Sequence, residues 1–282
     1  SIGICLGACT ITIARRTEEG VSYEEGVSYS SITHDGRVAE ELQTLLSQAL
    51  PARVGITGRA FRRMVTIPTL SEPEAVELAY ERLRPSCPDI DCIVSAGGET
   101  FIAYLLDGAG RIRSVQTGNK CASGTGEFFL QQIKRMDLDL EEATAAAMGA
   151  EPHPVAGRCS VFCKSDCTHA LNKGLPKGSV SAGLCKMMAG KILDLLNKTK
   201  ASRVLVIGGV SRNEVVMKYL RESSMEVFTL PQSPCFEALG ALIHAEKDGE
   251  LLSTAGSLLT PSHHSFTFHP GLRESMEKVR FT

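Results

Sequence analysis

The chain has 282 residues, a net charge of −2 and 43% hydrophobic residues, which is enough apolar sequence for one or two packed cores. Balanced charge excludes a broad basic surface for nucleic acid or anionic membrane, and no apolar run reaches the roughly 18 residues of a membrane-spanning helix. Ten cysteines without a recognisable secretion signal favour a reducing compartment, where thiols bind metals or act as reactive groups more often than they form disulfides.

The first third of the chain predicts a strand, a small-residue turn and a second strand. Residues 2–6 and 10–15 have strand character, and the turn between them contains Gly7, Ala8, Cys9 and Thr10. Such a turn suits a phosphate, because successive N–H groups can form an anion-binding hollow, but it is also typical of an ordinary β-turn. The elements expected next are a strand over 21–32, a helix over 37–50, a strand over 54–57 and a helix over 72–83.

The middle of the chain repeats this opening. A buried strand at 91–94 ends in a second small-residue turn that contains Gly97 and Gly98. Two further strands follow, at 101–106 and 112–116. Two halves that each begin with a strand and a small-residue turn are what a duplicated nucleotide-binding fold would show.

A loop around Cys121 leads into a helix predicted over 128–136. Gly124 and Gly126 permit a tight turn, and Ser123 or Thr125 can cap the helix. The N-terminus of a helix stabilises anions and lowers the pKa of a nearby thiol. The loop therefore suits a phosphate, a thiolate–metal cluster, or both.

The remainder of the chain predicts several helices and a third small-residue turn. That turn, Gly208 and Gly209, follows a strand at 203–207, and Ser211 or Asn213 begins the next helix. The sequence after Gly249 has weak periodicity and is interpreted as an extension or linker. The other expected elements are helices over 140–148, 165–172, 179–196, 214–220 and 235–246, a strand over 227–230 and a strand- or turn-like segment over 159–162.

Several motifs, in this order along residues 1–246, resemble the BadF/BadG/BcrA/BcrD family of ATPases. This family contains the activators of 2-hydroxyacyl-CoA dehydratases and related subunits of benzoyl-CoA reductase. The loop around Cys121 is especially similar to activase domains within long multidomain relatives. The motifs are TGRAFR at 57–62, GNKCASGTG at 118–126, CSVFCKSD at 159–166, GGVSRN at 208–213 and EALGALIHA at 237–245.

The resemblance implies an α/β fold of the actin, sugar kinase and Hsp70 type, a duplicated ribonuclease H-like fold with a nucleotide cleft between two subdomains. We expect the first subdomain at 1–93, the second, with the cluster loops, at 94–246, and the extension or linker at 247–282. The candidate residues for binding ATP or ADP with Mg²⁺ are Gly7, Ala8, Cys9, Thr10, Gly97, Gly98, Gly124, Thr125, Gly126, Gly208, Gly209 and Asn213.

The resemblance also implies a homodimer that shares one [4Fe–4S] cluster, with Cys121 and Cys159 of each subunit as ligands. Two thiolates per chain would supply the four that a cubane needs. ATP-driven subunit rotation would then lower the cluster's potential and pass an electron to a CoA-thioester dehydratase or reductase. An oxygen-sensitive cluster would place the protein in an anaerobe's cytoplasm, and neither nucleic acid nor membrane is an expected partner.

The sequence departs from the family in its phosphate turns. Cys5 and Ser95 stand where family members carry an acid, and Thr100 replaces a third. Glu99 is the acid left in the second turn and the candidate catalytic residue. Because Mg²⁺ prefers carboxylate and phosphate oxygens, hydrolysis of ATP and binding without hydrolysis both stay open.

Other interpretations are also open. Cys163 and Cys167 follow Cys159 at four-residue spacing, so they are either further ligands or small buried residues. The chain as a whole could be a non-redox actin-like kinase or nucleotide-binding module, in which Cys121 is only a small loop residue. It could also be a degenerate, non-hydrolysing or purely structural domain of a larger activase protein.

Overall fold

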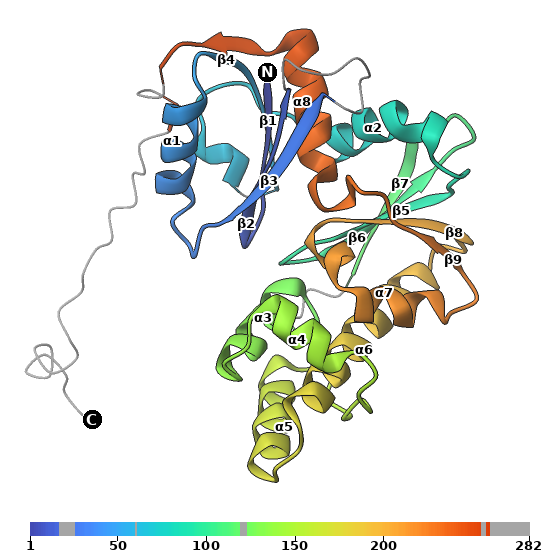
Figure 1. Cartoon of the computed structure of the whole chain (residues 1–282). Helices are drawn as coiled ribbons and strands as arrows, with labels where there is room; N and C mark the ends of the chain where they lie inside the picture. The colour runs from blue at the N-terminus through green and yellow to red at the C-terminus, as the bar shows by residue number, and fades with distance from the viewer. Residues whose placement is uncertain (17–25, 60, 119–122, 255–257, 260–282) are drawn as a thin grey trace, which may run out of the picture.

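A computed structural model describes residues 1–16, 26–59, 61–118, 123–254 and 258–259 (Figure 1). Its framework is two five-stranded sheets, in the orders β10-β4-β1-β2-β3 and β7-β6-β5-β8-β9. Four strands of each sheet match in connectivity, whereas the fifth differs, because β10 is antiparallel to β4 and β9 is parallel to β8. In each sheet, three successive strands pair antiparallel, and a later strand lies parallel beside the first of them. The duplication expected from the two strand–turn–strand openings is present.

The first sheet combines N-terminal strands with a short C-terminal one. Its strands are β1 (Ile2–Leu6), β2 (Thr10–Arg16), β3 (Val27–Thr33), β4 (Ala52–Thr57) and β10 (Glu250–Leu252). Helix α1 (Val38–Ala49) packs on the face of this sheet that carries Ile2, Ile4 and Ile56. Part of the segment expected as an extension or linker forms β10, which pairs with β4; its three residues are too few to show a periodicity in the sequence.

The second sheet follows the chain into its C-terminal half. Its strands are β5 (Cys92–Ala96), β6 (Phe101–Leu106), β7 (Ile112–Thr117), β8 (Arg203–Ile207) and β9 (Glu226–Phe228). The helices that follow β7 are α3 (Gly126–Arg135), α4 (Leu140–Ala147), α5 (Ser160–Asn172), α6 (Lys177–Leu196) and α7 (Glu214–Arg221). The subdomain boundary expected between residues 93 and 94 falls inside β5.

The described residues also contain four short 3₁₀ helices. They are η1 (Phe61–Met64), η2 (Arg84–Ser86), η3 (Gly209–Arg212) and η4 (Ser233–Cys235). Among the described residues, the structure contains no helix long and apolar enough to span a membrane.

Helix α5 corrects one local expectation. Residues 160–162 form its first turn, with Cys159 at the N-cap, rather than a strand or turn. The apolar residues Val161 and Phe162 suggested an extended segment, but their side chains are 70% and 66% exposed. Helix α5 thus carries apolar residues on its solvent side, so its pattern lacks the usual amphipathic period.

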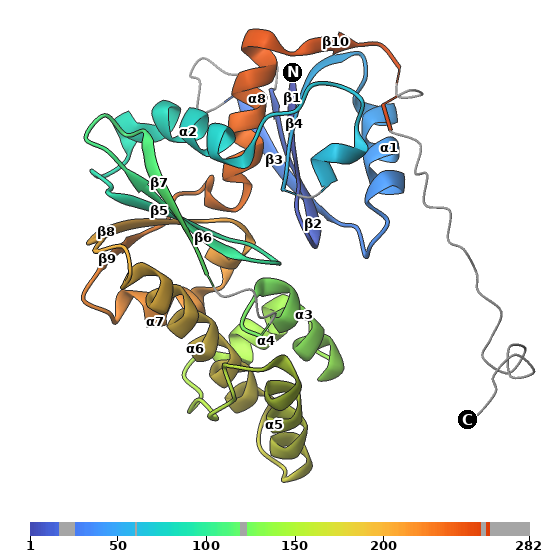
Figure 2. The same cartoon turned by 180° about the vertical axis from the view of Figure 1, so that it is seen from behind.

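Two helices lie between the sheets, α2 (Glu72–Leu83) and α8 (Phe236–Asp248), and Figures 1 and 2 show them crossing there. Their side chains share one buried cluster with residues from both sheets. The contact between the helices requires glycine, because a Cβ on Gly240 would lie 1.9 Å from the carbonyl oxygen of Ala75. Similarly, a Cβ on Gly3 of β1 would lie 2.1 Å from the backbone nitrogen of Leu242.

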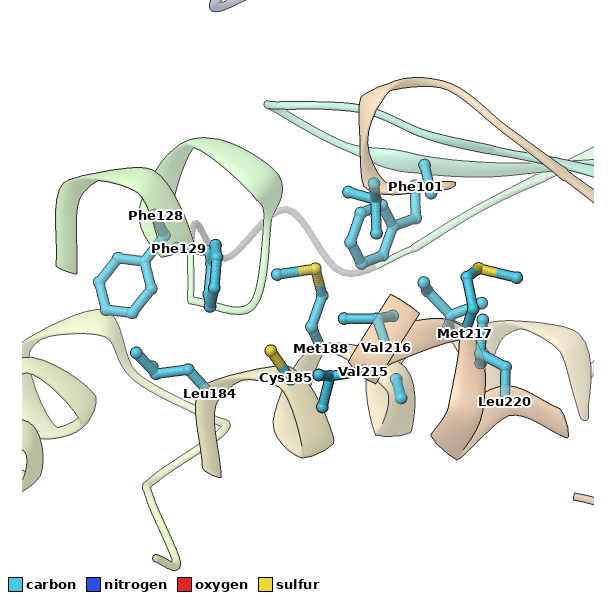
Figure 3. Close-up of a cluster of buried hydrophobic side chains, with 14 of the residues drawn as sticks. Phe101, Phe128, Phe129, Leu184, Cys185, Met188, Val215, Val216, Met217 and Leu220 are labelled. Carbon is cyan, nitrogen blue, oxygen red and sulfur yellow. The ribbon is translucent and has the colours of Figure 1, made fainter. Parts of the chain in front are cut away.

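The opposite face of the second sheet covers a separate core. Figure 3 shows Phe101 of β6 above Met188 of α6, with Phe128 and Phe129 of α3 beside them. Both α3 phenylalanines are buried, which anchors the first turn of that helix. The core therefore holds in place the helix that follows the Cys121 loop.

Candidate functional site

A cleft opens where the small-residue turns at the ends of β1, β5 and β8 meet. About 1250 Å³ of space lies between its walls, including space that is open to solvent. Most of the predicted nucleotide contacts line it, although they come from three separate parts of the chain. The predicted residues in its lining are Gly7, Ala8, Cys9, Thr10, Gly97, Gly98, Glu99, Gly126, Gly208, Gly209 and Asn213.

Two predicted contacts, Gly124 and Thr125, lie outside this lining and serve the start of α3. Gly124 adopts a positive φ of 80°, and a Cβ there would lie 2.5 Å from the Lys191 side chain. Thr125 is the N-cap, and its hydroxyl accepts a hydrogen bond from the Phe128 N–H at 3.4 Å. The backbone of α3 still reaches the cleft, through Gly126.

The turns offer hydrogen-bond donors and open space, which is the fit that a phosphate requires. None of the described residues accepts a hydrogen bond from the backbone N–H of Ala8, Cys9, Gly97 or Gly98. A Cβ on Gly97 would meet no atom within 4 Å, so the space above that backbone is free. Unpaired N–H groups at such turns are anion donors.

The first turn of α3 is bonded directly to the second phosphate turn. The N–H of Gly126 donates to the carbonyl oxygen of Gly97 at 3.2 Å, and the N–H of Glu127 donates to that of Gly98 at 3.0 Å. Any ligand that displaces the Gly97–Gly98 turn would therefore displace the start of α3 as well.

The cleft contains a buried acid that the sequence interpretation missed, Glu237 of α8. Its side chain is 6% exposed, and its Oε1 accepts a 2.8 Å hydrogen bond from the Ser95 hydroxyl. Burial, and then the neighbouring carboxylate of Glu72, raise the pKa of Glu237 to about 7. Glu72 lines the same cleft and accepts a 3.0 Å hydrogen bond from Arg59. The sequence did contain one sign of this buried acid, because Glu237 stands among apolar residues at the start of α8.

Two thiols, those of Cys5 and Cys9, also line the cleft, and both have a raised pKa. Burial, followed by the charge of Glu237, raises the pKa of Cys5 well above its usual range. Burial, together with Glu127 and Glu99, raises the pKa of Cys9 to about 11. Both thiols are therefore protonated at neutral pH and poor ligands for Mg²⁺. The candidate catalytic residue, Glu99, lies in the lining with an exposed side chain.

The structure brings together the chain segments beside the two predicted cluster ligands. Cys121 lies outside the described residues, whereas Cys159 is half-buried at the N-cap of α5. The hydroxyl of Ser123, two residues after Cys121, donates to the carbonyl oxygen of Gly157, two residues before Cys159, at 2.9 Å. Among the described residues, no three potential metal ligands form a group.

Cys163 and Cys167 point away from the exposed start of α5. Both are buried in the core against α6, and the Cys163 sulfur lies 3.9 Å from the Met187 sulfur. A hydrogen bond with Cys167 and burial raise the pKa of Cys163. These positions agree with the interpretation of small buried residues.

The chain is similar to known proteins along most of its length. The model of the BadF/BadG/BcrA/BcrD ATPase family matches residues 6–245. The 2-hydroxyisocaproyl-CoA dehydratase activator of Clostridioides difficile is 25% identical over 83% of this chain and 89% of its own length. The activator of lactoyl-CoA dehydratase of Anaerotignum propionicum is 26% identical over 56% of this chain and 62% of its own length.

Solved structures show the fold. The 2-hydroxyisocaproyl-CoA dehydratase activator from Clostridium difficile, solved with bound ADPNP, has a TM-score of 0.74 and 21% identity, with 100% of this chain and 98% of that chain covered. Component A of the Acidaminococcus fermentans (R)-2-hydroxyglutaryl-CoA dehydratase has a TM-score of 0.68 and 21% identity, with 88% of this chain and 97% of that chain covered. The expected actin, sugar kinase and Hsp70 type of fold is confirmed.

Proposed function

The chain belongs to the BadF/BadG/BcrA/BcrD ATPase family, and from this membership we propose that it is an ATP-dependent iron–sulfur activator. In this proposal the chain binds ATP with Mg²⁺ in the cleft and donates one electron to a 2-hydroxyacyl-CoA dehydratase or a benzoyl-CoA reductase-like partner. Relatives named as activators of such dehydratases, or as part of a benzoyl-CoA reductase, support the substrate class of that partner.

One observation carries the proposal: the start of α3 connects the nucleotide cleft with the cysteine loops. Gly126 and Glu127 are bonded to the second phosphate turn, and Ser123, three residues before Gly126, is bonded to the Gly157 carbonyl. Movement of the turn when phosphate is bound or released would pass through these few residues to the loop that carries Cys121. Such a connection is what coupling between nucleotide and cluster requires.

The residues near the cysteines suit a cluster shared by two chains. When bound, a [4Fe–4S] cluster would supply the electron, and Cys121 and Cys159 of each chain would hold it. Cys159 lies at the N-terminus of α5, where the helix dipole stabilises the negative charge that a cluster would bring. The exposed Val161 and Phe162 beside Cys159 form an apolar face that a second copy of the chain would cover.

The alternative is a degenerate domain that binds nucleotide without hydrolysing it. Cys5 and Ser95 favour it, because neither side chain offers a carboxylate at the ends of β1 and β5. Against it, Glu72 and Glu237 bring two carboxylates to the cleft from the helices between the sheets. We therefore propose turnover, with Mg²⁺ bound through nucleotide phosphates and these acids rather than through the strand ends.

The test is purification without oxygen, followed by measurement of iron, acid-labile sulfide, native mass and Mg-ATP hydrolysis. We expect about two iron and two sulfide per chain in a dimer, and their loss in Cys121→Ala and in Cys159→Ala. Cys163→Ala is the matched control and should retain its iron. A monomer that takes up no iron on reconstitution contradicts the electron-transfer role, and an iron-loaded dimer without ATP hydrolysis supports the degenerate alternative.

A further inference from the structure

His34 contacts the first phosphate turn from behind. It follows β3 and is 2% exposed, and its Nε2 lies 3.1 Å from the carbonyl oxygen of Gly7. Its Nδ1 accepts a 3.1 Å hydrogen bond from the N–H of Gly36. Because a carbonyl oxygen only accepts and a backbone N–H only donates, these two contacts assign the donor role to Nε2 and the acceptor role to Nδ1.

The same residue also engages a second carbonyl group of the turn. The backbone N–H of His34 donates to the carbonyl oxygen of Cys9 at 3.2 Å. The ring of Phe61, which lines the cleft, packs edge-on against the imidazole, with centroids 5.7 Å apart and planes at 79°. His34 is therefore held from two sides, and it holds the turn at both Gly7 and Cys9.

This anchoring determines which way one N–H group of the turn points. The Gly7 C=O and the Ala8 N–H belong to one planar trans peptide, so they point in opposite directions. When the Gly7 C=O points at His34, the Ala8 N–H points away from it. Ala8 lines the cleft, and its N–H has no acceptor among the described residues.

We propose that His34 is a positioning residue for phosphate: by holding the Gly7 carbonyl, it directs the Ala8 N–H to a phosphate oxygen of the nucleotide. His34 touches no ligand and acts only through the turn. The inference rests on the proposed function for the presence of a nucleotide, but the anchoring of the turn can be measured without one.

Three substitutions separate the two ring nitrogens. His34→Gln places a donor near the Nε2 position, His34→Asn places an acceptor near the Nδ1 position, and His34→Phe retains only the ring. We expect the Asn and Phe variants to bind Mg-ATP roughly tenfold more weakly, and the Gln variant to stay within about twofold of the unmodified chain. His244→Asn, on α8 and outside the cleft lining, is the matched control and should bind normally.

The measurements are a calorimetric Mg-ATP titration of the full chain and hydrogen exchange of residues 6–10 without nucleotide. Exchange should rise in the Asn and Phe variants and not in the Gln variant. The positioning role of His34 would be overturned, with the proposed function left standing, by either of two results. One is equal Mg-ATP affinity of His34→Asn and the unmodified chain, and the other is a Gln variant that binds Mg-ATP as weakly as the Phe variant. An unmodified chain that binds no nucleotide would overturn the proposed function and the phosphate role together, and the exchange data would then report on the anchor.

Discussion

Glu237 is a cleft residue whose charge depends strongly on folding. Its carboxyl group is buried beside Glu72 and bonded to Ser95, and the pKa of about 7 lies above the ordinary value of 4.5. A raised carboxyl pKa means that the folded state holds the proton more tightly than the unfolded state. Its contribution to stability is full below about pH 4.5, falls as pH rises, and is lost above about pH 7.

Glu237→Gln tests this sign directly. The amide oxygen still accepts from Ser95, but the side chain no longer titrates. From pH 4.5 to above pH 7, the free energy of unfolding of the unmodified chain should fall by roughly 3 kcal/mol relative to the variant. Urea unfolding across this range measures the difference, and Glu99→Gln, an exposed acid of the same cleft, controls for the loss of one negative charge. Parallel curves for Glu237→Gln and the unmodified chain would contradict the expectation.

At the scale of elements, the position of α8 between the sheet and α2 depends on glycine. Gly240 faces the Ala75 carbonyl, whereas Gly190 of α6 has no neighbour within 4 Å of an added Cβ. Both are helix positions, so intrinsic helix propensity favours alanine equally at each. Any difference between the two alanine variants therefore reports the packing of α8 against α2.

Gly240→Ala should lower the free energy of unfolding by about 3 kcal/mol, because the backbones of α2 and α8 must separate. Gly190→Ala should raise it by up to about 1 kcal/mol. Urea denaturation of the two single variants gives both numbers. If Gly240→Ala were as stable as Gly190→Ala, the close packing of the two helices would be refuted.

At the scale of the whole molecule, the two sheets share a core. The buried cluster that contains Phe236 of α8 also contains Cys5 of the first sheet and Ile93 and Leu205 of the second. Neither sheet can lose its packing on this side without exposing apolar surface of the other. The chain therefore has the structural requirement for unfolding as one unit.

Scanning calorimetry should show a single transition with equal calorimetric and van't Hoff enthalpies. Mg-ATP should move the whole transition upward, by about 2.7 kcal/mol of stability at a hundredfold excess over its dissociation constant. Two transitions, with one sheet surviving proteolysis after the other has melted, would show that the shared core does not couple them.

Much of this architecture could be predicted from local sequence. Alternation and helical spacing indicated most strands and helices, because burial on one face imposes a period that a single sequence displays. The small residues of the three turns indicated a phosphate site, and eleven of the predicted site residues line the cleft. The ligand roles of Cys121 and Cys159 stay predictions, since Cys121 lies outside the described residues.

The sequence by itself thus determined the order of the elements, the glycine turns and the family, since these depend on short-range patterns. Only the tertiary structure decided which distant residues complete the site. Glu237 meets Ser95 across 142 positions of chain, and His34 meets Gly7 across 27. Strand β10 likewise forms because β4 offers an unpaired edge. Such contacts depend on how the sheets and helices pack, and no local pattern of residues records that.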